Sequence, residues 1–361
     1  MTEDIARNAI ITITDGISPT SMPYNEFVLY RKNKKLDEQQ ILILLFKDSY
    51  DKSIINIPTD VKLFCVGKNV IKLRSLLCDL EKNYNVKAYH IHEGKSVIMF
   101  SIASLLRLRS KAIYTLHSTY KNYPFHNKLF SFCASVLAKK VVCVSRTSYK
   151  YYPSILKFLR GKDAMSIQNG VDIDRIDAAG DAYDTIGRPF TMVYVARLVP
   201  LKRHYILFNV LKQLPNVHLD LIGQGPLASE LKVMVKDLGI ENQVSFKGLL
   251  PREEVYRQLK SADLYVSTSS YEGLPIGVLE AMGCGAACLV TNIEQHTEIS
   301  EKCTSLITLP ADVNLWVEKI GELIEMDKTQ LRQIGIMNRK SVSENFSLES
   351  MHLQYDKLYY R

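Results

Sequence analysis

The sequence of 361 residues lacks the features that mark a membrane-spanning or a disulfide-bonded protein. Its longest apolar runs, residues 41–46 and 97–106, fall short of the roughly 20 residues that a membrane-spanning helix needs. The first residues, MTEDIARNAI, are acidic and polar where a signal peptide is basic and then apolar, so we expect no leader. The seven cysteines are odd in number and include no C-x-x-C pair, which favours reduced thiols in a cytoplasmic protein over a zinc site or a disulfide framework.

Acidic residues are absent from residues 94–162, although this segment contains 13 lysines and arginines. The rest of the chain has 33 basic and 38 acidic residues, so this segment accounts for the formal net charge of +8. Binding to nucleic acid would need an accompanying motif, and because none is present we expect no nucleic-acid partner. An anionic membrane surface or an anionic substrate is the favoured partner, and a solvated basic face without a partner is the alternative.

Short apolar runs alternate with segments of helical period, which is typical of a parallel sheet built from βαβ units. In the first half we predict strands at residues 10–14, 41–46, 61–66, 88–92, 112–117, 141–145 and 164–169. Helices are predicted between them at residues 68–81, 96–106, 126–139 and 146–158. In the second half the predicted strands are residues 190–198, 217–223, 243–248, 263–268, 286–291 and 305–309, with helices at 253–260 and 276–282. Two further helical segments close the chain.

We therefore expect an α/β protein of two doubly wound, Rossmann-like domains that face each other across a cleft. The N-terminal domain covers residues 1–175, a linker covers residues 176–189, and the C-terminal domain covers residues 190–345. A C-terminal helix within residues 346–361 is expected to pack back on the N-terminal domain. Ligands of such sheets bind outside the carboxyl ends of the strands, so the functional residues should lie in strand-to-helix loops.

The strongest motif is SSYEGLPIGVLEAMGCG at residues 269–285, where a strand is followed by a turn and a helix. The Gly-Leu-Pro turn at the helix start exposes backbone N–H groups that, with the helix dipole, can bind phosphate. Glu272 in the turn and Glu280 about two turns into the helix place two carboxylates near one ligand, where they suit sugar hydroxyls or developing positive charge. A helix cap with an exposed glutamate is the alternative.

A second motif, VYVARLVPLKRH at residues 193–204, places Arg197 at the end of a strand and Lys202 after a proline turn. Two cations at the carboxyl edge of a parallel sheet are well placed to neutralise a diphosphate leaving group. Solvated loop cations are the alternative. Gly223 and Gly248 also end strands at this edge, where their loops suit a nucleoside, although tight turns explain these glycines equally well.

These motifs resemble the donor domain of the retaining, GT-B-fold glycosyltransferases of family 4, the group 1 glycosyltransferases. The E-x(7)-E element matches at Glu272 and Glu280, and the Arg…Lys pair matches at Arg197 and Lys202. The first half is similar more faintly, through HIH at 90–92, TLH at 115–117, VS at 144–145 and NGVD at 169–172. The resemblance covers about residues 88–300.

The resemblance implies a role for each matching residue. The donor diphosphate is held by Arg197 and Lys202, Glu272 contacts the sugar hydroxyls, and Glu280 contacts the ribose. His117 reaches the sugar or its β-phosphate from the opposite domain, so His117, Arg197, Lys202 and Glu272 are the expected catalytic residues. Further contacts to the donor are expected from Gly16, Gly223, Gly248, Leu249, Gly273, Leu274 and Pro275.

The acceptor side of the resemblance rests on fewer residues. His92 and Ser18 are the weaker candidates for acceptor contacts, and an ordinary packed histidine is the alternative for both His92 and His117. The family usually has a glycine pair after its first strand. Here Gly16 stands alone and is followed by hydroxyl side chains such as Ser18 and Thr20, which changes the expected phosphate cradle and acceptor site.

The resemblance also implies that no metal or other cofactor is needed, because family members bind nucleotide sugars without a catalytic metal. A UDP-sugar is favoured over a GDP-sugar as donor. The D-x-D sequence at residues 172–174 follows NGV in a loop and is interpreted as turn chemistry rather than a metal site.

The expected activity is therefore transfer of a hexose or an N-acetylhexosamine, with retention, to a hydroxyl group of a glycan or lipid-linked acceptor. No carboxylate is identified as a covalent nucleophile, and a front-face reaction needs none. The expected pathway is bacterial capsule, O-antigen or exopolysaccharide synthesis, on the inner face of the plasma membrane. A nucleotide-sugar epimerase of the same fold and a non-catalytic partner of an active transferase are the alternatives.

Overall fold

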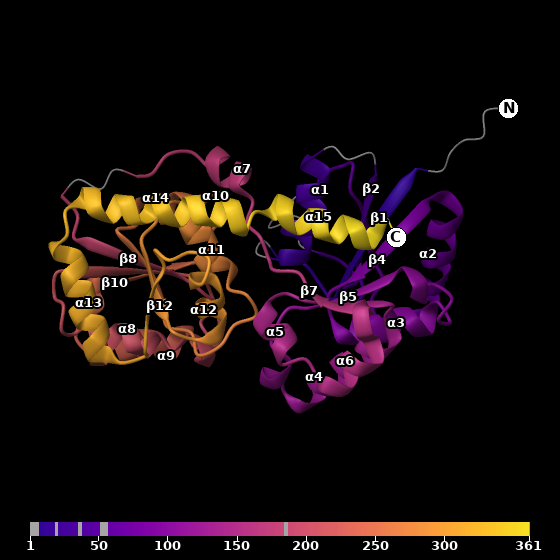
Figure 1. Ribbon diagram of the computed structural model, residues 1–361, viewed down its shortest axis with the longest axis horizontal. Helices are drawn as coiled ribbons and strands as arrows, with labels where there is room; N and C mark the ends of the chain where they lie inside the picture. Colours follow the sequence, from indigo (N-terminus) through magenta and orange to yellow (C-terminus); the bar gives the residue numbers. More distant parts are fainter. Residues whose placement is uncertain (1–6, 19–20, 35–37, 51–56, 184–186, 361) are drawn as a thin grey trace. The chain divides into compact units, whose positions relative to one another are not determined.

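The protein is described by a computed structural model over residues 7–18, 21–34, 38–50, 57–183 and 187–360 (Figure 1). The chain divides into two compact units, an N-terminal unit of residues 1–168 with 351–361 and a C-terminal unit of residues 169–350. Each unit has its own parallel sheet and its own hydrophobic core. The predicted α/β class with two doubly wound sheets is therefore confirmed.

The sheet of the N-terminal unit is parallel, with the strand order β3-β2-β1-β4-β5-β6-β7. Its strands are β1 (Asn8–Thr14), β2 (Gln39–Leu44), β3 (Lys62–Cys65), β4 (Asn85–Ile91), β5 (Ala112–Leu116), β6 (Lys140–Cys143) and β7 (Ala164–Ser166). Its larger connecting helices are α2 (Val70–Asn83), α3 (Gly94–Ala103) and α4 (Phe125–Leu137). The order 3-2-1-4-5 is that of a Rossmann-like sheet.

The C-terminal unit repeats this order as β10-β9-β8-β11-β12-β13. Its strands are β8 (Phe190–Val195), β9 (Val217–Ile222), β10 (Val244–Gly248), β11 (Leu264–Ser267), β12 (Cys288–Thr291) and β13 (Ile307–Leu309). Its helices include α8 (His204–Leu211), α9 (Ala228–Asp237), α10 (Arg252–Ser261), α11 (Ile276–Gly283) and α12 (Glu294–Ser300). Alternate residues of β8 face opposite sides: Met192 and Tyr194 pack with α8 and α9, whereas Val193 packs with α10 and α11.

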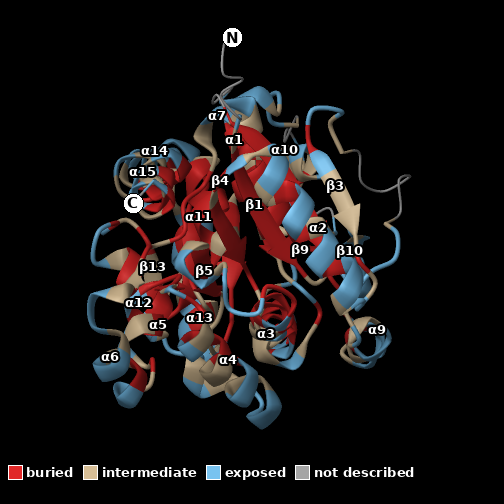
Figure 2. Ribbon diagram, turned by 90° about the vertical axis from the view of Figure 1, so that its right-hand side faces the viewer, coloured by how far each residue is buried: buried red, intermediate tan, exposed pale blue. Residues whose placement is uncertain are grey.

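Every predicted strand is present, although several end a few residues earlier than expected. Figure 2 shows that buried residues follow the central strands, such as β1 and β4, whereas the edge strand β3 is only partly buried and exposed residues lie on the outer faces of the helices. This burial on both faces explains why the strands appear in the sequence as continuous apolar runs. No helix in the described ranges combines the length and the apolarity that crossing a membrane requires.

Three predicted helical segments differ from the structure. The helix predicted over residues 146–158 is two helices, α5 (Arg146–Lys150) and α6 (Ser154–Arg160), because Pro153 between them has no N–H group to continue a helix. The two predicted closing segments are three helices, α13 (Val313–Glu325), α14 (Lys328–Asn345) and α15 (Leu348–Tyr359). A capping box at Asp327 starts α14 directly after α13.

A short helix also overlaps the start of the predicted linker. This helix, α7 (Ile173–Ala178), is capped by Asp172, whose side chain accepts a hydrogen bond of 3.1 Å from the backbone N–H of Arg175. The first aspartate of the D-x-D sequence therefore has a capping role, which agrees with its interpretation as turn chemistry.

The last helix of the chain completes the core of the N-terminal unit. On α15, the Tyr355 hydroxyl lies 3.1 Å from the Thr115 hydroxyl, and the Tyr359 hydroxyl lies 2.8 Å from Nδ1 of His90. The buried Arg31 guanidinium donates to Asp356 on the same helix over 2.5 Å. Removal of Asp356 would take away one counter-charge of the buried Arg31 guanidinium, so these contacts help to hold the end of the chain in place.

Candidate functional site

An ion pair in the C-terminal unit joins the two motifs that the sequence analysis selected. Nζ of Lys202 lies 2.5 Å from Oε1 of Glu272, and the two side chains are only 18% and 13% exposed. Burial alone would lower the pKa of Lys202, but the Glu272 carboxylate outweighs it, so the pKa of Lys202 is raised above its ordinary value. Lys202 is therefore a fixed positive charge at the carboxyl edge of the sheet.

Hydrogen bonds from side chains to backbone carbonyl groups hold the loop after β8 against the loop after β11. Arg203 has a left-handed backbone (φ 48°), and its side chain donates to the carbonyl groups of Thr268 and Ser269 over 2.8 and 2.7 Å. The Thr268 hydroxyl donates in return to the carbonyl of Lys202 over 2.8 Å. These bonds fix the positions of Lys202 and Glu272, which are 70 residues apart in the sequence.

The predicted phosphate turn leads directly into α11. Gly273, Leu274 and Pro275 follow Glu272, and Pro275 is the N-cap residue of α11. Leu274 is buried in the core beneath the helix, which anchors the turn. A Cβ atom on Gly277 would lie only 3.0 Å from the Tyr265 hydroxyl, so this helix start packs closely on the strand below it.

Glu280 is held by two residues that the sequence analysis missed. Arg252 at the start of α10 donates to Oε1 of Glu280 over 2.8 Å from Nε and 2.5 Å from Nη2, and the Tyr256 hydroxyl donates to the same oxygen over 2.9 Å. All three donors share Oε1, which leaves Oε2 available to a ligand hydroxyl. The only hint in the sequence is that Arg252 and Tyr256 are four residues apart and so share one face of a helix. This spacing does not identify Glu280 as the residue that they contact.

Different constraints act on the two predicted glycines at this edge, close packing on Gly223 and a left-handed backbone on Gly248. Gly223 (φ 141°) donates to the carbonyl of Gly248 over 2.8 Å, and a Cβ atom on Gly223 would lie 2.0 Å from the Ala196 carbonyl oxygen. Gly248 (φ 70°) faces open space and is followed by the exposed Leu249. Arg197 is exposed on the neighbouring loop after β8. The structure thus brings the predicted loops to one edge, but the packing explains Gly223 without a ligand.

A buried histidine lies near the Lys202–Glu272 pair. His296 on α12 hydrogen-bonds through Nδ1 to the Thr291 carbonyl over 2.6 Å, whereas its buried Nε2 has no partner in the described part of the chain. Burial lowers the pKa of His296 to about 4, so the imidazole is neutral. Since a carbonyl only accepts, Nδ1 carries the hydrogen and Nε2 is an acceptor.

In the N-terminal unit, the two predicted histidines contact each other. His92 and His117 follow the adjacent strands β4 and β5, and Nδ1 of His92 lies 2.8 Å from Nε2 of His117. Burial lowers the pKa of His117 to about 4, and burial, with His90 and His117 nearby, lowers that of His92. Both imidazoles are therefore neutral near pH 7, and His117 can hydrogen-bond to a ligand without adding positive charge.

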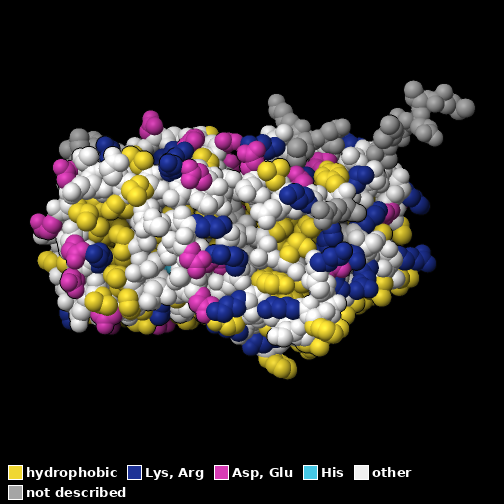
Figure 3. All heavy atoms as spheres, viewed as in Figure 1, with side chains coloured by type: hydrophobic (Ala, Val, Ile, Leu, Met, Phe, Trp, Pro, Cys, Tyr) yellow, Lys and Arg dark blue, Asp and Glu magenta, His cyan; other side chains and the backbone are white. Residues whose placement is uncertain are grey.

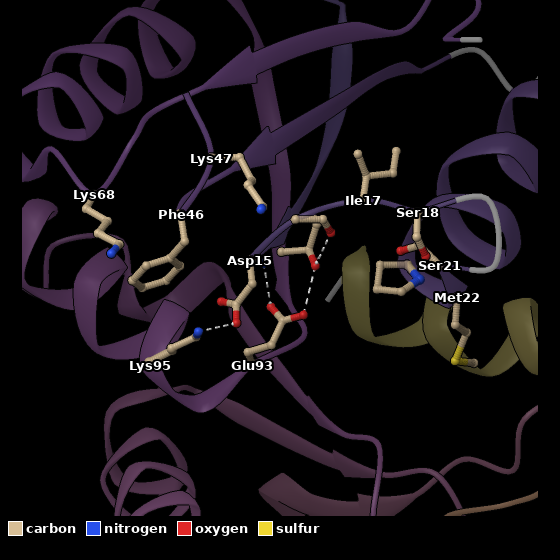
Figure 4. A pocket seen from close by; sticks show the side chains of 13 residues that line it. Asp15, Ile17, Ser18, Ser21, Met22, Phe46, Lys47, Lys68, Glu93 and Lys95 are labelled. Carbon is tan, nitrogen blue, oxygen red and sulfur yellow. Dashed lines mark hydrogen bonds and ion pairs between the residues drawn. The ribbon is translucent and has the colours of Figure 1, made fainter. Parts of the chain in front are cut away.

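Gly16 and Ser18 line a pocket of about 780 Å³ at the carboxyl ends of β1 to β4 (Figure 4). Its other lining residues are Thr14, Asp15, Ile17, Ser21, Met22, Pro23, Phe46, Lys47, Lys68, Glu93 and Lys95. The lysines and Glu93 are further residues that the sequence analysis missed, because they follow three different strands, β2, β3 and β4. Thr20 lies outside the described residues.

Glu93 is the unusual titratable group of this pocket. Burial raises the pKa of Glu93 to about 8, and the nearby Asp15 carboxylate adds to this. Hydrogen bonds from the Thr14 hydroxyl (2.8 Å) and from the backbone N–H of Asp15 (3.0 Å) act in the opposite direction but are outweighed. Glu93 is therefore mostly protonated at neutral pH.

Within the described ranges, no group of three or more histidine, cysteine, aspartate or glutamate side chains is arranged to hold a metal ion.

The sequence model of the family described as "Glycosyl transferases group 1" matches residues 181–339. This range contains the Lys202–Glu272 pair, the turn before α11 and Glu280. Over these residues the C-terminal unit has the sequence pattern of the group 1 glycosyltransferases. The resemblance to this family is thereby confirmed, and with it the general class of the protein as a transferase.

Two curated relatives are similar along most of the chain. The N-acetyl-alpha-D-glucosaminyl L-malate synthase of Bacillus anthracis is 24% identical over 306 residues, which are 80% of this chain and 78% of the relative. The UDP-Gal:alpha-D-GlcNAc-diphosphoundecaprenol alpha-1,3-galactosyltransferase of Escherichia coli is 26% identical over 258 residues, which are 64% of this chain and 65% of the relative.

Solved structures show the same fold. HepE of Anabaena, solved in complex with UDP-glucose, superposes with a TM-score of 0.77 at 20% identity, over 97% of this chain and 98% of that chain. The expected GT-B class is therefore confirmed.

The raised pKa of Glu93 predicts the effect of Glu93→Gln on stability. The folded protein keeps this proton up to pH about 8, whereas an ordinary glutamate loses it near pH 4.5. The folded state thus binds more protons than the unfolded state between these values, so the wild type loses stability as the pH rises through this window. Because Gln cannot ionise, we expect equal stability at pH 4.5 and a variant more stable by about 1–2 kcal/mol at pH 8, after discounting for partial exposure.

Thermal unfolding at both pH values measures this difference. Glu230→Gln, on the exposed surface of α9, controls for the loss of one carboxylate. A Glu93→Gln variant that is less stable than the wild type at pH 8 would show that Glu93 is ionised in the folded protein.

Proposed function

We propose that this protein is a retaining glycosyltransferase that transfers a hexose or an N-acetylhexosamine from a UDP-sugar to a hydroxyl group of a glycan or lipid-linked acceptor. The observation that carries the proposal is the Lys202–Glu272 ion pair, which lies in the family-matched range just before α11. The pathway that we propose is bacterial surface polysaccharide synthesis, as capsule, O-antigen or exopolysaccharide.

The charges around Lys202 suit a diphosphate that leaves with developing negative charge. Lys202 keeps its proton beside Glu272, and Arg197 is exposed on the same loop, from which it can reach the nucleotide. The N-terminus of α11 adds the partial positive charge of a helix dipole. Positive groups fixed where charge develops stabilise a transition state more than a ground state.

The way in which the two motif carboxylates are held supports a retaining reaction without a protein nucleophile. Glu272 accepts from Lys202, and Oε1 of Glu280 accepts from Arg252 and Tyr256, so each carboxylate is paired with a cation. Such carboxylates suit sugar and ribose hydroxyls better than nucleophilic attack. A front-face reaction, in which the leaving phosphate accepts the proton of the acceptor hydroxyl, retains configuration without a protein nucleophile.

The names of the relatives support a UDP-sugar donor and a bacterial glycoconjugate acceptor. The E. coli relative is named for UDP-Gal and for an acceptor linked to diphosphoundecaprenol, and the B. anthracis relative is named for an N-acetylglucosaminyl group and L-malate. HepE was solved with UDP-glucose. We assign no metal to this reaction, since Lys202 and Arg197 supply the positive charge.

Substitution of Lys202 tests the donor site. We expect Lys202→Ala to weaken UDP binding by about ten- to a hundredfold, because a hydrogen bond to a charged group contributes about 1.5–3 kcal/mol. Isothermal titration with UDP, GDP and ADP measures this loss and identifies the base. Lys212→Ala, an exposed lysine just after α8, is the matched control and should bind UDP as the wild type does.

The same titration separates the proposal from its alternatives. If the wild type binds none of the three nucleotides, the donor site is wrong and a non-catalytic partner of an active transferase is the better account. If UDP binds, incubation with a UDP-sugar in the absence of acceptor distinguishes an epimerase, which would convert the sugar of the donor.

We also propose that α4 and α6 dock on an anionic membrane surface. The two helices pack together and expose large apolar side chains, among them Phe125 and Phe158, each 84% exposed. Exposed lysines such as Lys150 and Lys162 lie in the same acid-free segment. Figure 3 shows apolar and basic side chains side by side over this part of the N-terminal unit. Apolar insertion combined with positive charge is the chemistry of peripheral binding to anionic lipids.

Sedimentation with lipid vesicles tests this surface. We expect the double variant Phe125→Ser/Phe158→Ser to bind vesicles of phosphatidylcholine and phosphatidylglycerol at least about tenfold more weakly, since each buried Phe contributes about 1.5–3 kcal/mol. Ile71→Ser/Ile336→Ser removes two exposed apolar side chains from α2 and α14 and is the control. Equal losses in both variants, or equal binding to vesicles of phosphatidylcholine alone, would contradict the proposal.

A further inference from the structure

The pocket beside Gly16 has a charge that the donor site does not explain. It is lined by residues that follow four strands of the N-terminal sheet: Asp15 and Gly16 after β1, Lys47 after β2, Lys68 after β3, and Glu93 and Lys95 after β4 (Figure 4). We propose that this pocket binds a phosphate group of the acceptor through Lys47, Lys68 and Lys95. This inference rests on the proposed function, since it names the chemical class of the acceptor.

Only one of the three lysines is neutralised by a neighbouring carboxylate. Nζ of Lys95 lies 2.6 Å from Oδ2 of Asp15 and 4.4 Å from the centre of the Phe46 ring. Lys47 and Lys68 form no ion pair with any residue in the described ranges. Figure 4 shows their amino groups on the side of the pocket that holds Asp15 and Phe46. A ligand can therefore bind two amines that form no ion pair within the part of the chain that the structure describes.

Besides Asp15, the pocket contains the carboxyl group of Glu93, which adds little negative charge. The single hydroxyl hydrogen of Thr14 cannot serve both oxygens within its reach, Oε1 of Glu93 at 2.8 Å and the Gly16 carbonyl at 3.2 Å. A protonated Glu93 resolves this conflict, because it donates to Thr14, which then donates to Gly16. The raised pKa of Glu93 agrees with this assignment.

The net charge of the pocket indicates which class of ligand it can bind. Three amines and one ionised carboxylate leave two positive charges in the pocket when Glu93 is protonated. This charge matches a phosphate monoester or diphosphate, and a neutral sugar would leave the amines without compensation. The N-terminus of α3, which begins next to Glu93, adds a partial positive charge of the same sign.

The backbone holds Lys68 at the rim of the pocket. Gly67 (φ 66°) and Lys68 (φ 64°) are consecutive left-handed residues, and Lys68 donates its N–H to the Leu45 carbonyl over 2.7 Å. The left-handed backbone of Gly67 favours glycine, and a Cβ atom there would also require the exposed Asp48 side chain to move. A left-handed lysine is uncommon, and such conformations concentrate where a side chain must be placed for function.

Lysine acylation read by mass spectrometry tests the pocket residue by residue. Inorganic pyrophosphate is the soluble probe, and vesicles of phosphatidylcholine and phosphatidic acid present the same group as a lipid headgroup. We expect at least one probe to slow acylation of Lys47, Lys68 and Lys95, but not of the exposed Lys82 on α2. Protection by pyrophosphate points to a soluble phosphate, and protection by vesicles alone points to a lipid headgroup. Sodium chloride of equal ionic strength controls for screening.

The same acylation experiment on the double variant Lys47→Glu/Lys68→Glu is the second test of the pocket. We expect this variant to abolish protection of Lys95 and to raise the dissociation constant of pyrophosphate at this site by at least about tenfold, because two charge-assisted contacts are lost. Arg74→Glu/Lys82→Glu, both on the exposed face of α2, changes the charge of the same unit by the same amount and should keep the protection.

Failure of this inference differs from failure of the donor site. If neither probe protects the three lysines, or if both double variants behave alike, the phosphate pocket is wrong even where UDP still binds. If the pocket lysines are protected but UDP does not bind and Lys202 reacts equally with and without it, the proposed transferase function fails and a phosphate site remains.

Discussion

The ion pair between Lys202 and Glu272 joins the two loops that carry the donor motifs, and its position depends on the loops around it. Arg203 adopts a left-handed backbone and donates to the carbonyls of Thr268 and Ser269, which fixes one loop against the other. On a protein surface, where both side chains move freely, an ion pair between a lysine and a glutamate contributes little to stability. Here both are largely buried, so the pair sets a permanent charge pattern at one edge of the sheet.

The two units differ in how their positive and negative side chains are balanced. In the C-terminal unit, each motif carboxylate is matched by a cation, Glu272 by Lys202 and Glu280 by Arg252. In the N-terminal unit, the pocket beside Gly16 has more amines than ionised carboxylates. A transferase that handles a nucleotide diphosphate and a phosphate-bearing acceptor would need positive charge in both units. His92 and His117 of the N-terminal unit are neutral and add none.

Almost all of the strands and helices could be predicted, because each is determined mainly by the pattern of its own residues. Apolar runs of strand length mark each strand of two sheets that are buried on both faces, and the helices between them follow from their period. The errors are local as well: Pro153 divides one predicted helix, and the capping box at Asp327 separates two closing helices. In each case a single residue at a boundary outweighs the apolar pattern around it.

The candidate site could be predicted only where its residues form a motif. Lys202, Glu272 and Glu280 stand in short, recognisable sequences, whereas Arg252 is 28 residues from the carboxylate that it holds. Glu93 and the three pocket lysines follow three different strands, β2, β3 and β4, and only the sheet order brings them together. A lysine at a strand end has no sequence feature that distinguishes a ligand contact from a solvated loop.

A crystal structure of the full chain with UDP tests the central claim most directly, because it places the diphosphate relative to Lys202. We expect a phosphate oxygen within hydrogen-bond distance of Nζ of Lys202, the diphosphate at the N-terminus of α11, and the ribose against Glu280. A nucleotide bound elsewhere, with the 2.5 Å contact between Lys202 and Glu272 unchanged, would contradict the assignment of this pair to the donor.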